Sequence, residues 1–442
     1  PLQLPPLLVS LSNSIMLLYQ LKEVDIVKSM AKMKYHYGLK VRIYPSDKQK
    51  QIIKLNSDAS RFIYNEMVAI NKELWQLKQV KLPIDTVQSR IKQLELRQNA
   101  KQMSNHFQFL GDKRIDSLTK ANAIQNYRKA WNAFRKIHTA GVPNFHRKSY
   151  VWRYQTNCQY LKQKEAYLTN GTVRFEDSKH VLVPKLGRLR VKGSHQRILA
   201  RSAETRIGTV TITKDAIGSF FLSMQLASDA PFVTMPKQTN RQVGIDLNTE
   251  NFLTSSDGQV IANPRYYRTI KGRLAKAQRI LSRRARRAKK EHRSLRESRN
   301  YQKQRLLVAK IHTQIFSRRR AFLHQLSTTL IKNHDLVVAE ELRSKNMLKN
   351  HALAMSIADV GWRTFLEMLT YKAKLYGRQF ITVNPKNTTQ TCHDCGFVMG
   401  TGSTKKLTLA DREWICPKCH VHHIRDHNAA QNILTKGIAK LA

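Results

Sequence analysis

Four of the five cysteines in this chain form two closely spaced pairs. Cys392 and Cys395 form one C-x-x-C pair, and Cys416 and Cys419 form a second pair after 20 intervening residues. Four thiolates in two such turns match a tetrahedral structural zinc site with no open coordination position. Only Cys158 remains, which argues against a disulfide framework and for a reducing compartment. We therefore expect a zinc ribbon that stabilises its segment and takes no part in chemistry.

Two alternatives concern this cysteine block. The histidines beside it could replace a cysteine as zinc ligand, but with four thiols available we expect them to contact nucleic acid or to be bystanders. Redox chemistry is disfavoured, because two pairs at ribbon spacing fit one shared ion. The histidines concerned are His393, His420, His422 and His423.

The charge of the chain indicates a polyanionic partner. Its 442 residues include 78 Lys+Arg and 30 Asp+Glu, a formal net charge of +48. The hydrophobic fraction of 41% is typical of globular proteins, which argues against wholesale disorder. Nucleic acid is the partner that we expect, and a membrane surface is the lesser alternative.

Membrane and secretory segments are not apparent. The apolar run 7–19 is interrupted by serines and asparagine and lacks the basic start of a signal peptide. We expect a protein of the bacterial cytoplasm or nucleoid.

The first half of the chain predicts a β-rich domain interrupted by helices. Residues 1–33 are weakly charged and Leu-rich, and we interpret them as an N-terminal extension, with a short packed helix as the alternative. Alternation over 35–43 predicts a strand, and Ser46 with Gln49 has the spacing of a capping box. Helical periodicity then continues to residue 138, and strand patterns return over 148–236.

The second half predicts an α/β layer. Strands are expected at 242–247, 252–254, 260–261, 336–339 and 379–383. We expect helices at 361–375 and from Asn428, and one long helix over roughly 269–333. Residues 268–320 of that helix carry 20 Lys/Arg and two glutamates. Such a basic helix is expected to follow phosphates, and a solvated charged helix is the alternative.

Three carboxylates stand beside these elements. Asp246 follows a strand of apolar residues, Glu340 ends the strand at 336–339, and Asp426 precedes the last helix. Taken alone, each has an ordinary explanation: a turn, a solvated strand end or a helix N-cap. Together, three carboxylates of one α/β layer can converge on two divalent ions, which activate water for phosphodiester hydrolysis. Oxygen ligands favour Mg²⁺ or Mn²⁺.

Several motifs occur in an order that resembles the TnpB family, RNA-guided nucleases encoded by insertion-sequence transposons and similar to the ancestors of type V CRISPR effectors. The resemblance covers about residues 34–442. Its motifs are Arg61–Asn65, Gly141–Phe145, Val183–Gly187, Gly244–Leu247, Val338–Leu342, Gly361-Trp362, Pro385–Cys395, the Cys416/Cys419 pair and Arg425–Ala430.

The resemblance implies a multidomain α+β fold. A RuvC-like (RNase H-type) α/β nuclease domain would comprise 239–386 and 423–442, with the zinc ribbon inserted at 387–422. A β-barrel wedge domain would comprise 34–46 and 148–238, interrupted by a helical recognition domain at 47–147.

The resemblance also implies which residues act. Asp246, Glu340 and Asp426 fall on the three catalytic positions, and they would bind Mg²⁺ or Mn²⁺. Glu341 beside Glu340 leaves the second position slightly ambiguous, although the family pattern favours Glu340. His420 stands where the family usually has Gly, which predicts strain in that turn.

The function implied is RNA-guided cutting of double-stranded DNA beside a short flanking motif. The partners would be a guide RNA derived from the element and the target DNA, with no membrane; the sequence leaves monomer or dimer open. The residues that we expect to contact nucleic acid are Arg283, Arg284, Arg286 and Arg287 in the basic helix, and Lys120, Asn122, Gln125 and Arg128 in the helical block, where amides could bond bases. An ordinary polar helix face is the alternative for the second group.

Three alternatives stay open from the sequence. The first is a catalytically silent zinc-ribbon protein that regulates transposition, and the second is a protein-only DNA transposase. The third is a compact type V CRISPR effector, which has the same chemistry.

Overall fold

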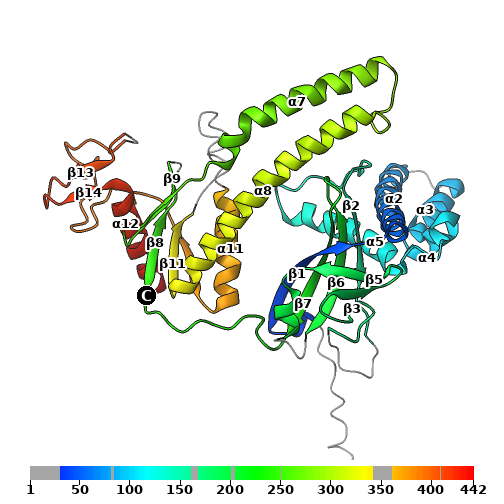
Figure 1. Cartoon of the computed structure of the whole chain (residues 1–442), viewed down its shortest axis with the longest axis horizontal. Coiled ribbons are helices and arrows are strands. Elements are labelled where there is room, and N and C mark those ends of the chain that lie inside the picture. Colours follow the sequence, from blue (N-terminus) through cyan, green and yellow to red (C-terminus); the bar gives the residue numbers. More distant parts are fainter. Residues whose placement is uncertain are drawn as a thin grey trace, which may run out of the picture. The chain divides into compact units, whose positions relative to one another are not determined.

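The computed structural model describes residues 30–80, 84–160, 168–200, 205–248, 250–341, 361–408 and 410–442. These residues form a mixed α/β fold with two compact units, divided between Phe232 and Val233 (Figure 1). Residues 1–29, most of the expected extension, lie outside the described residues. Within the described part, Met30–Lys32 form a 3-10 turn and Met33 is buried. No helix of the described part is long and apolar enough to cross a membrane.

The first unit contains a seven-stranded antiparallel sheet with the order β2-β6-β7-β1-β5-β4-β3. β1 precedes the helices in sequence and pairs with β5 and β7, which follow them. Its inward residues Leu39, Val41 and Ile43 are buried, as the alternating pattern predicts. The strands are β1 (Tyr35–Tyr44), β2 (Trp152–Asn157), β3 (Arg174–Phe175), β4 (His180–Val183), β5 (Gly187–Lys192), β6 (Arg206–Lys214) and β7 (Phe220–Ser228).

Helices between β1 and β2 form the second part of this unit. The capping box is confirmed: the Ser46 hydroxyl accepts from the Gln49 amide at 3.3 Å, and the Gln49 side chain accepts from the Ser46 amide at 2.8 Å. Ile63 and Met67 of the first long helix pack in one core with Ile124. The helices are α2 (Asp47–Leu77), α3 (Asp85–Arg97), α4 (Ala100–His106) and α5 (Ser117–Lys136), and η2 (Gln108–Gly111) is a 3-10 turn; the short α6 (His195–Leu199) lies between β5 and β6.

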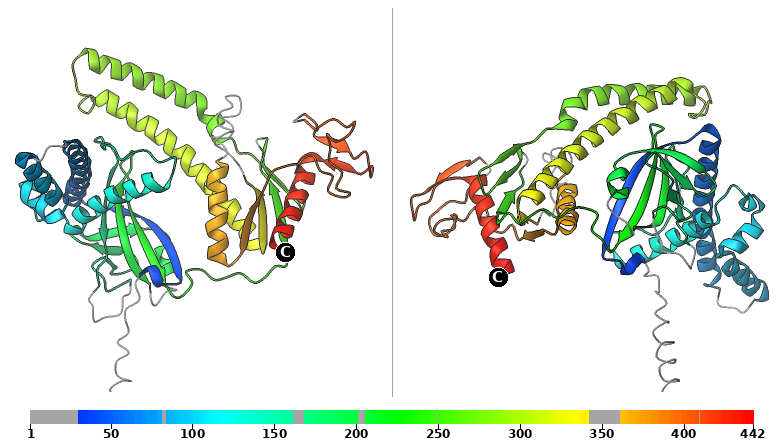
Figure 2. Two further views of the ribbon diagram at one scale, coloured as in Figure 1. Left: turned by 180° about the vertical axis from the view of Figure 1, so that it is seen from behind. Right: turned by 60° about the horizontal axis from the view of Figure 1, so that its bottom comes forward.

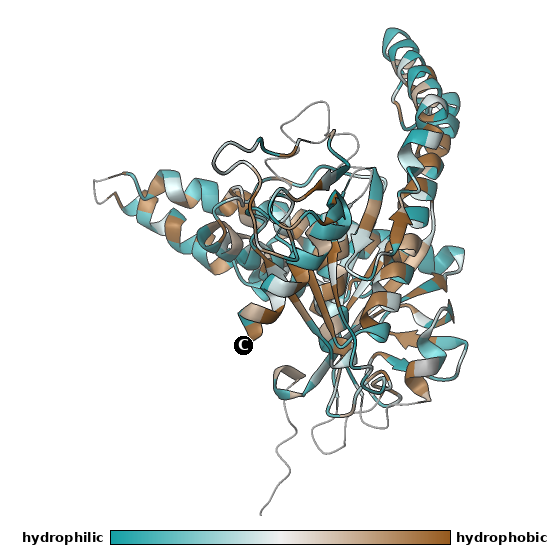
Figure 3. Ribbon diagram, turned by 90° about the vertical axis from the view of Figure 1, so that its left-hand side faces the viewer, coloured by the Kyte–Doolittle hydropathy of each residue, from teal (hydrophilic) through white to brown (hydrophobic). Residues whose placement is uncertain are grey.

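The second unit is built on a five-stranded sheet with the order β10-β9-β8-β11-β12, in which β11 runs parallel to β8 and β12. Helices α8 and α11 cover one face of the sheet and α12 covers the other (Figures 1 and 2). The strands are coloured mostly as hydrophobic, whereas the helices carry both colours (Figure 3). The elements are β8 (Gln242–Asp246), β9 (Asn251–Ser255), β10 (Val260–Ala262), α7 (Tyr266–Lys290), α8 (Arg299–Asn333), β11 (Leu336–Glu340), α11 (Trp362–Tyr376), β12 (Gln379–Val383), β13 (Glu413–Ile415), β14 (His422–Ile424) and α12 (Arg425–Leu441).

The single long helix expected over 269–333 is wrong, because the segment folds as the hairpin of α7 and α8. The chain reverses at His292, whose φ of 49° is left-handed, and the Arg293 amide donates to the Ala288 carbonyl at 2.9 Å, as in a helix C-cap. Leu274 and Ala277, which form an apolar stripe along α7, are buried against Val308, Ile311 and Ile315 of α8. The stripe therefore packs against the returning helix.

The last helix begins at Arg425, three residues before the expected start, so Asp426 lies in its first turn and Ile424 is the N-cap residue. Two glycines let this helix lie against the sheet. A Cβ at Gly244 of β8 would stand 2.2 Å from the Ala430 carbonyl oxygen, and one at Gly437 would stand 2.4 Å from Val338 Cγ2.

Candidate active site and metal centre

The alternation of β8 and β11 decides which way the first two carboxylates point. Val243 and Ile245 pack in the core beneath α8 and α11. Gly244 contacts α12 on the opposite face, so Asp246, two residues further on, points to the α12 side. On the neighbouring parallel strand, Val338 packs under α12 and Glu340 points the same way.

These two carboxylates lie at the same level of the sheet. Ile245 pairs in register with Ala339, so Asp246 and Glu340 occupy the next positions of adjacent strands. Neighbouring strands are about 4.8 Å apart. Asp246 is 7% exposed and Glu340 is half-buried. Two buried acidic groups at one edge of a sheet form an electronegative site.

The third carboxylate comes from α12, which crosses this face. Asp426 accepts from the Arg425 guanidinium at 3.0 and 3.1 Å, and Arg412 lies 3.8 Å from its other oxygen. Arg425 is itself buried and donates to the Thr408 carbonyl at 2.8 Å. These arginines offset part of the negative charge.

Burial and neighbouring charges both act on the pKa of Asp246. Burial, and then the negative charges of Glu340 and Asp426, raise the pKa of Asp246 to about 8. A hydrogen bond from Asn248 and the charge of Arg425 oppose the shift. Burial also raises the pKa of Glu340, while Thr388 and Lys436 oppose it. Asp246 is thus within electrostatic range of both Glu340 and Asp426, although, among the described residues, the oxygens of these three carboxylates do not all lie within 4.8 Å of one another.

Glu340 and its neighbour Glu341 differ in environment. The Thr388 hydroxyl donates to Glu340, and Lys436 of α12 acts on it through its charge. Glu341 is exposed, and its amide continues the sheet by donating to the Val383 carbonyl at 2.9 Å. The geometry favours Glu340 as the residue that shares a site with Asp246.

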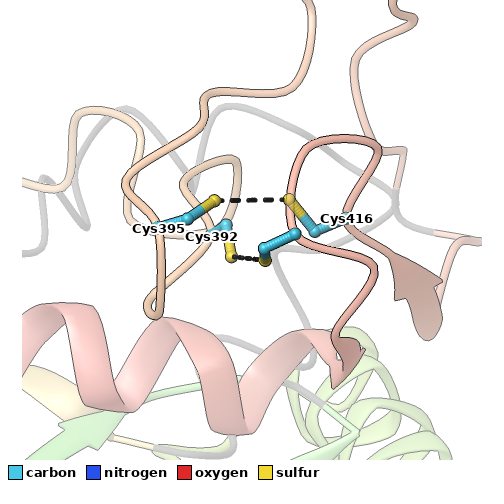
Figure 4. A group of neighbouring side chains, drawn as sticks. Cys392, Cys395 and Cys416 are labelled. Carbon is cyan, nitrogen blue, oxygen red and sulfur yellow. Dashed lines mark hydrogen bonds between the residues drawn. The ribbon is translucent and has the colours of Figure 1, made fainter.

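The four paired cysteines converge although they come from two separate turns (Figure 4). Their sulfur atoms all lie within 4.8 Å of one another. Cys392 and Cys419, and likewise Cys395 and Cys416, are 3.6 Å apart between sulfurs. A tetrahedral ion with Zn–S bonds of about 2.3 Å requires roughly 3.8 Å between sulfurs. The four thiols therefore fit one zinc ion.

One of the four nearby histidines also faces this cluster. His423 is buried, its Nε2 lies 3.1 Å from Cys392 Sγ and 3.6 Å from an Asp394 oxygen, and its ring packs against Trp414. His422 instead lies 3.1 Å from Glu413, and the predicted strain at His420 is present as a left-handed φ of 59°.

Two asparagines of α12 connect the cysteine cluster to the carboxylates, and the sequence did not single them out. Asn428 accepts from the His393 amide at 2.9 Å and donates to the Thr391 carbonyl at 2.7 Å. Asn432 donates to the Thr388 and Thr391 carbonyls at 2.9 and 2.7 Å. Both are buried. Asn residues at a spacing of four on an otherwise apolar helix face are the signal that could have identified them.

The residues expected to contact nucleic acid divide into exposed and internally bonded groups. Arg283 and Arg286 are exposed on α7; Arg287 is exposed and donates to Glu291 at 2.9 Å, and Arg284 is half-buried and donates to the Asn300 carbonyl at 2.7 Å.

On α5 the same division holds. Gln125 and Arg128 are exposed. Lys120 is half-buried and donates to the Ser104 hydroxyl and the Leu110 carbonyl, and Asn122 donates to the Leu118 carbonyl.

Cys158, the cysteine outside the cluster of four, is half-buried against the sheet core of its unit.

Three family models match this chain. Residues 222–351 match the family described as "Probable transposase" (OrfB_IS605), and residues 362–433 match the "Cas12f1-like, TNB domain". Residues 33–79 match a "Helix-turn-helix domain", although here they contain β1 and the single helix α2.

Curated proteins and a solved structure are similar over most of the chain. The "Putative RNA-guided DNA endonuclease" of Streptomyces pristinaespiralis is 32% identical, over 92% of this chain and 90% of that protein. The "Putative RNA-guided DNA endonuclease InsQ" of Escherichia coli (strain K12) is 26% identical, over 93% and 94%.

The solved structure shares the fold. The structure titled "Cryo-EM structure of the Cas12f1-sgRNA-target DNA complex" is matched with a TM-score of 0.53 at 13% identity, over 90% of this chain and 98% of that one. With the fold and the matched relatives in agreement, the chain belongs to the TnpB family of IS605-type transposon proteins.

Proposed function

We propose that this chain is an RNA-guided DNA endonuclease of the metal-dependent, RuvC-like type. The observation that carries the proposal is the register of β8 and β11, which places Asp246 and Glu340 at adjacent positions on the side of the sheet that α12 covers, with Asp426 in the first turn of that helix. Ionised carboxylates that are buried and repel one another are costly unless a cation binds between them. The names of the matched relatives support the same function and do not favour a silent regulator or a protein-only transposase.

In this proposal the second unit holds the nuclease layer with the cysteine segment as its zinc ribbon. The first unit holds the wedge and recognition segments, with the boundaries expected from the family. A guide RNA from the element and double-stranded target DNA are the partners. The exposed arginines of α7 contact phosphates.

The chain's own residues prepare the site for hydrolysis. Asp246, Glu340 and Asp426 would hold two Mg²⁺ or Mn²⁺ ions, which supply an activated water and stabilise the leaving oxygen. Thr388 orients Glu340 by donating a hydrogen bond to it. Arg425, fixed by the Thr408 carbonyl, orients Asp426. Burial of Asp246 excludes bulk water from one side of the site.

The test is guided cutting by the protein co-purified with its RNA. A plasmid that matches the guide should be cut with Mg²⁺ and left intact with a chelator. Asp246→Ala, Glu340→Gln and Asp426→Asn should each abolish cutting, whereas Glu341→Gln, the exposed neighbour, should retain it. RNA-independent strand transfer, or full cutting by Asp246→Ala, would overturn the proposal.

A further inference from the structure

A hollow of about 600 Å³ lies where the end of β12 meets the second half of α12. Its lining includes three lysines and two amides: Lys386, Lys436, Lys440, Asn384 and Asn387. None of the lining residues is acidic or aromatic. We call this site the lysine hollow.

The lysine hollow borders the candidate active site. Val383 lines it and pairs in register with Glu340 on the adjacent strand. Lys436 also lines it, and its positive charge acts on Glu340. A strand that places one phosphate at Glu340 can therefore present a neighbouring phosphate to the hollow, because Val383 and Lys436 border both Glu340 and the hollow.

The ammonium groups are held in place and retain free donors. Lys436 Nζ donates to the Lys386 carbonyl, and Lys440 Nζ donates to the Thr382 carbonyl at 3.0 Å. An ammonium has three donors, so each keeps two for a ligand. Asn387, with a left-handed φ of 60°, shapes a tight turn in which the Thr391 amide donates to the Asn387 carbonyl at 3.0 Å. The rim is thus a defined turn.

The chemistry of the lining selects a phosphate backbone. Lysine ammonium groups are typical ligands of phosphate oxygens, and a lining without aromatic side chains offers no surface on which bases could stack. We propose that the lysine hollow binds the phosphates of the DNA strand being cut, next to the scissile bond on the Glu340 side. The inference rests on the proposed function. It commits to the DNA strand and not to the guide RNA, although both carry the same phosphate chemistry.

The experiment compares two charge-matched double variants in the RNA-loaded protein. Lys386→Gln/Lys440→Gln removes two hollow lysines and leaves Lys436 beside Glu340. Arg363→Gln/Lys374→Gln removes two exposed cations from α11, on the opposite face of the sheet. The substrates are guide-matched DNAs with one neutral methylphosphonate placed in turn at each linkage near the cut.

The hollow variant should cut unmodified DNA about tenfold more slowly in a single turnover, and the α11 variant should cut at the normal rate. At one linkage the methylphosphonate should slow cutting by the unaltered protein as much as the two hollow substitutions do. The same methylphosphonate should not slow the hollow variant any further. Independent effects at every linkage, or normal cutting by the hollow variant, would overturn the phosphate site. If neutral linkages slow cutting only when they are placed in the guide RNA, the hollow binds the guide RNA. That outcome also overturns the proposal.

A binding measurement separates this inference from the proposed function. Should the unaltered protein cut nothing, the salt dependence of its affinity for a single-stranded DNA still tests the hollow. Two lost phosphate contacts should lower the slope of log K against log salt by about 1.4 in the hollow variant only. An unchanged slope would refute the proposal that the lysine hollow binds phosphates. A lowered slope in a protein that cuts nothing would refute only the proposed nuclease function.

Discussion

Gly244 of β8 and Ala430 of α12 approach so closely that a Cβ on Gly244 would stand 2.2 Å from the Ala430 carbonyl oxygen and 2.7 Å from the Leu434 amide. Both obstacles are backbone atoms, which cannot rotate away. This contact sets how near α12 lies to the strand that ends in Asp246, and therefore where Asp426 meets it.

Gly244→Ala should consequently push α12 away from the sheet. We expect a loss of about 2 kcal/mol or more in the free energy of unfolding, because overpacking against backbone costs at least 1–3 kcal/mol, together with loss of cutting. The measurement is the urea unfolding midpoint. Gly272→Ala in α7 is the control, since its Cβ meets nothing within 4 Å, and it should be neutral or stabilising. Equal behaviour of the two variants would contradict the close approach.

The pKa of Asp246 predicts how stability depends on pH in the absence of Mg²⁺. The folded chain keeps a proton on Asp246 up to about pH 8, whereas an unfolded aspartate loses it near pH 4. The corresponding stabilisation is fully present below about pH 4 and is lost as the pH rises through about 8.

Between pH 5 and 8 the unaltered chain should therefore lose about 3.5 kcal/mol more stability than Asp246→Asn, whose amide does not titrate. Saturating Mg²⁺ at pH 8 should restore the unaltered chain and leave the variant unchanged. Urea unfolding at each pH measures the difference. Parallel pH profiles for the two proteins would show that Asp246 is not held in this environment.

Zinc removal should disturb the carboxylate site as well as the ribbon, because Asn428 bonds the turn at Cys392 and lies two residues from Asp426. The purified chain should contain one zinc ion, and Cys419→Ser should lose it, become open to proteolysis within 387–422 and cut DNA poorly. Cys158→Ser, outside the cluster, should keep both zinc and activity. Full zinc content in Cys419→Ser would contradict the four-thiol site.

The exposed arginines of α7 should contribute to nucleic-acid affinity through charge. Arg283→Gln/Arg286→Gln should lower the salt slope of guide-RNA binding by roughly 1.4, and Arg363→Gln/Lys374→Gln on α11 should leave it unchanged. The check is RNA affinity measured from 50 to 300 mM salt. Equal slopes in both variants would show that α7 is a solvated charged helix that does not contact the phosphates of the RNA.

Much of the local structure of both units could be predicted from sequence pattern. β11 and β12 were expected because short runs of β-branched residues specify buried strands, and the capping box at Ser46 was expected because its contacts are three residues apart. The hairpin of α7 and α8 was not, since the apolar stripe gives a face but does not show where a helix reverses. His292 could only be recognised as the turning point from its backbone angle.

The candidate site divides in the same way. The three carboxylates were identifiable because each ends or begins an element, whereas their supporting groups depend on contacts distant in sequence. Thr388 reaches Glu340 and Arg412 approaches Asp426 only after the cysteine segment has folded back on α12. The start of α12 was misplaced because an Asp before a helix is typical of an N-cap, and here it belongs to the first turn.

The central claim is tested most directly by counting the Mn²⁺ ions that the RNA-loaded protein binds in the presence of single-stranded DNA. The ions are counted in a titration monitored by electron paramagnetic resonance. The account predicts two ions close enough to couple magnetically, and loss of that coupling in Asp246→Asn, Glu340→Gln and Asp426→Asn but not in Glu341→Gln. Unchanged Mn²⁺ binding in the first three variants would contradict a shared carboxylate site.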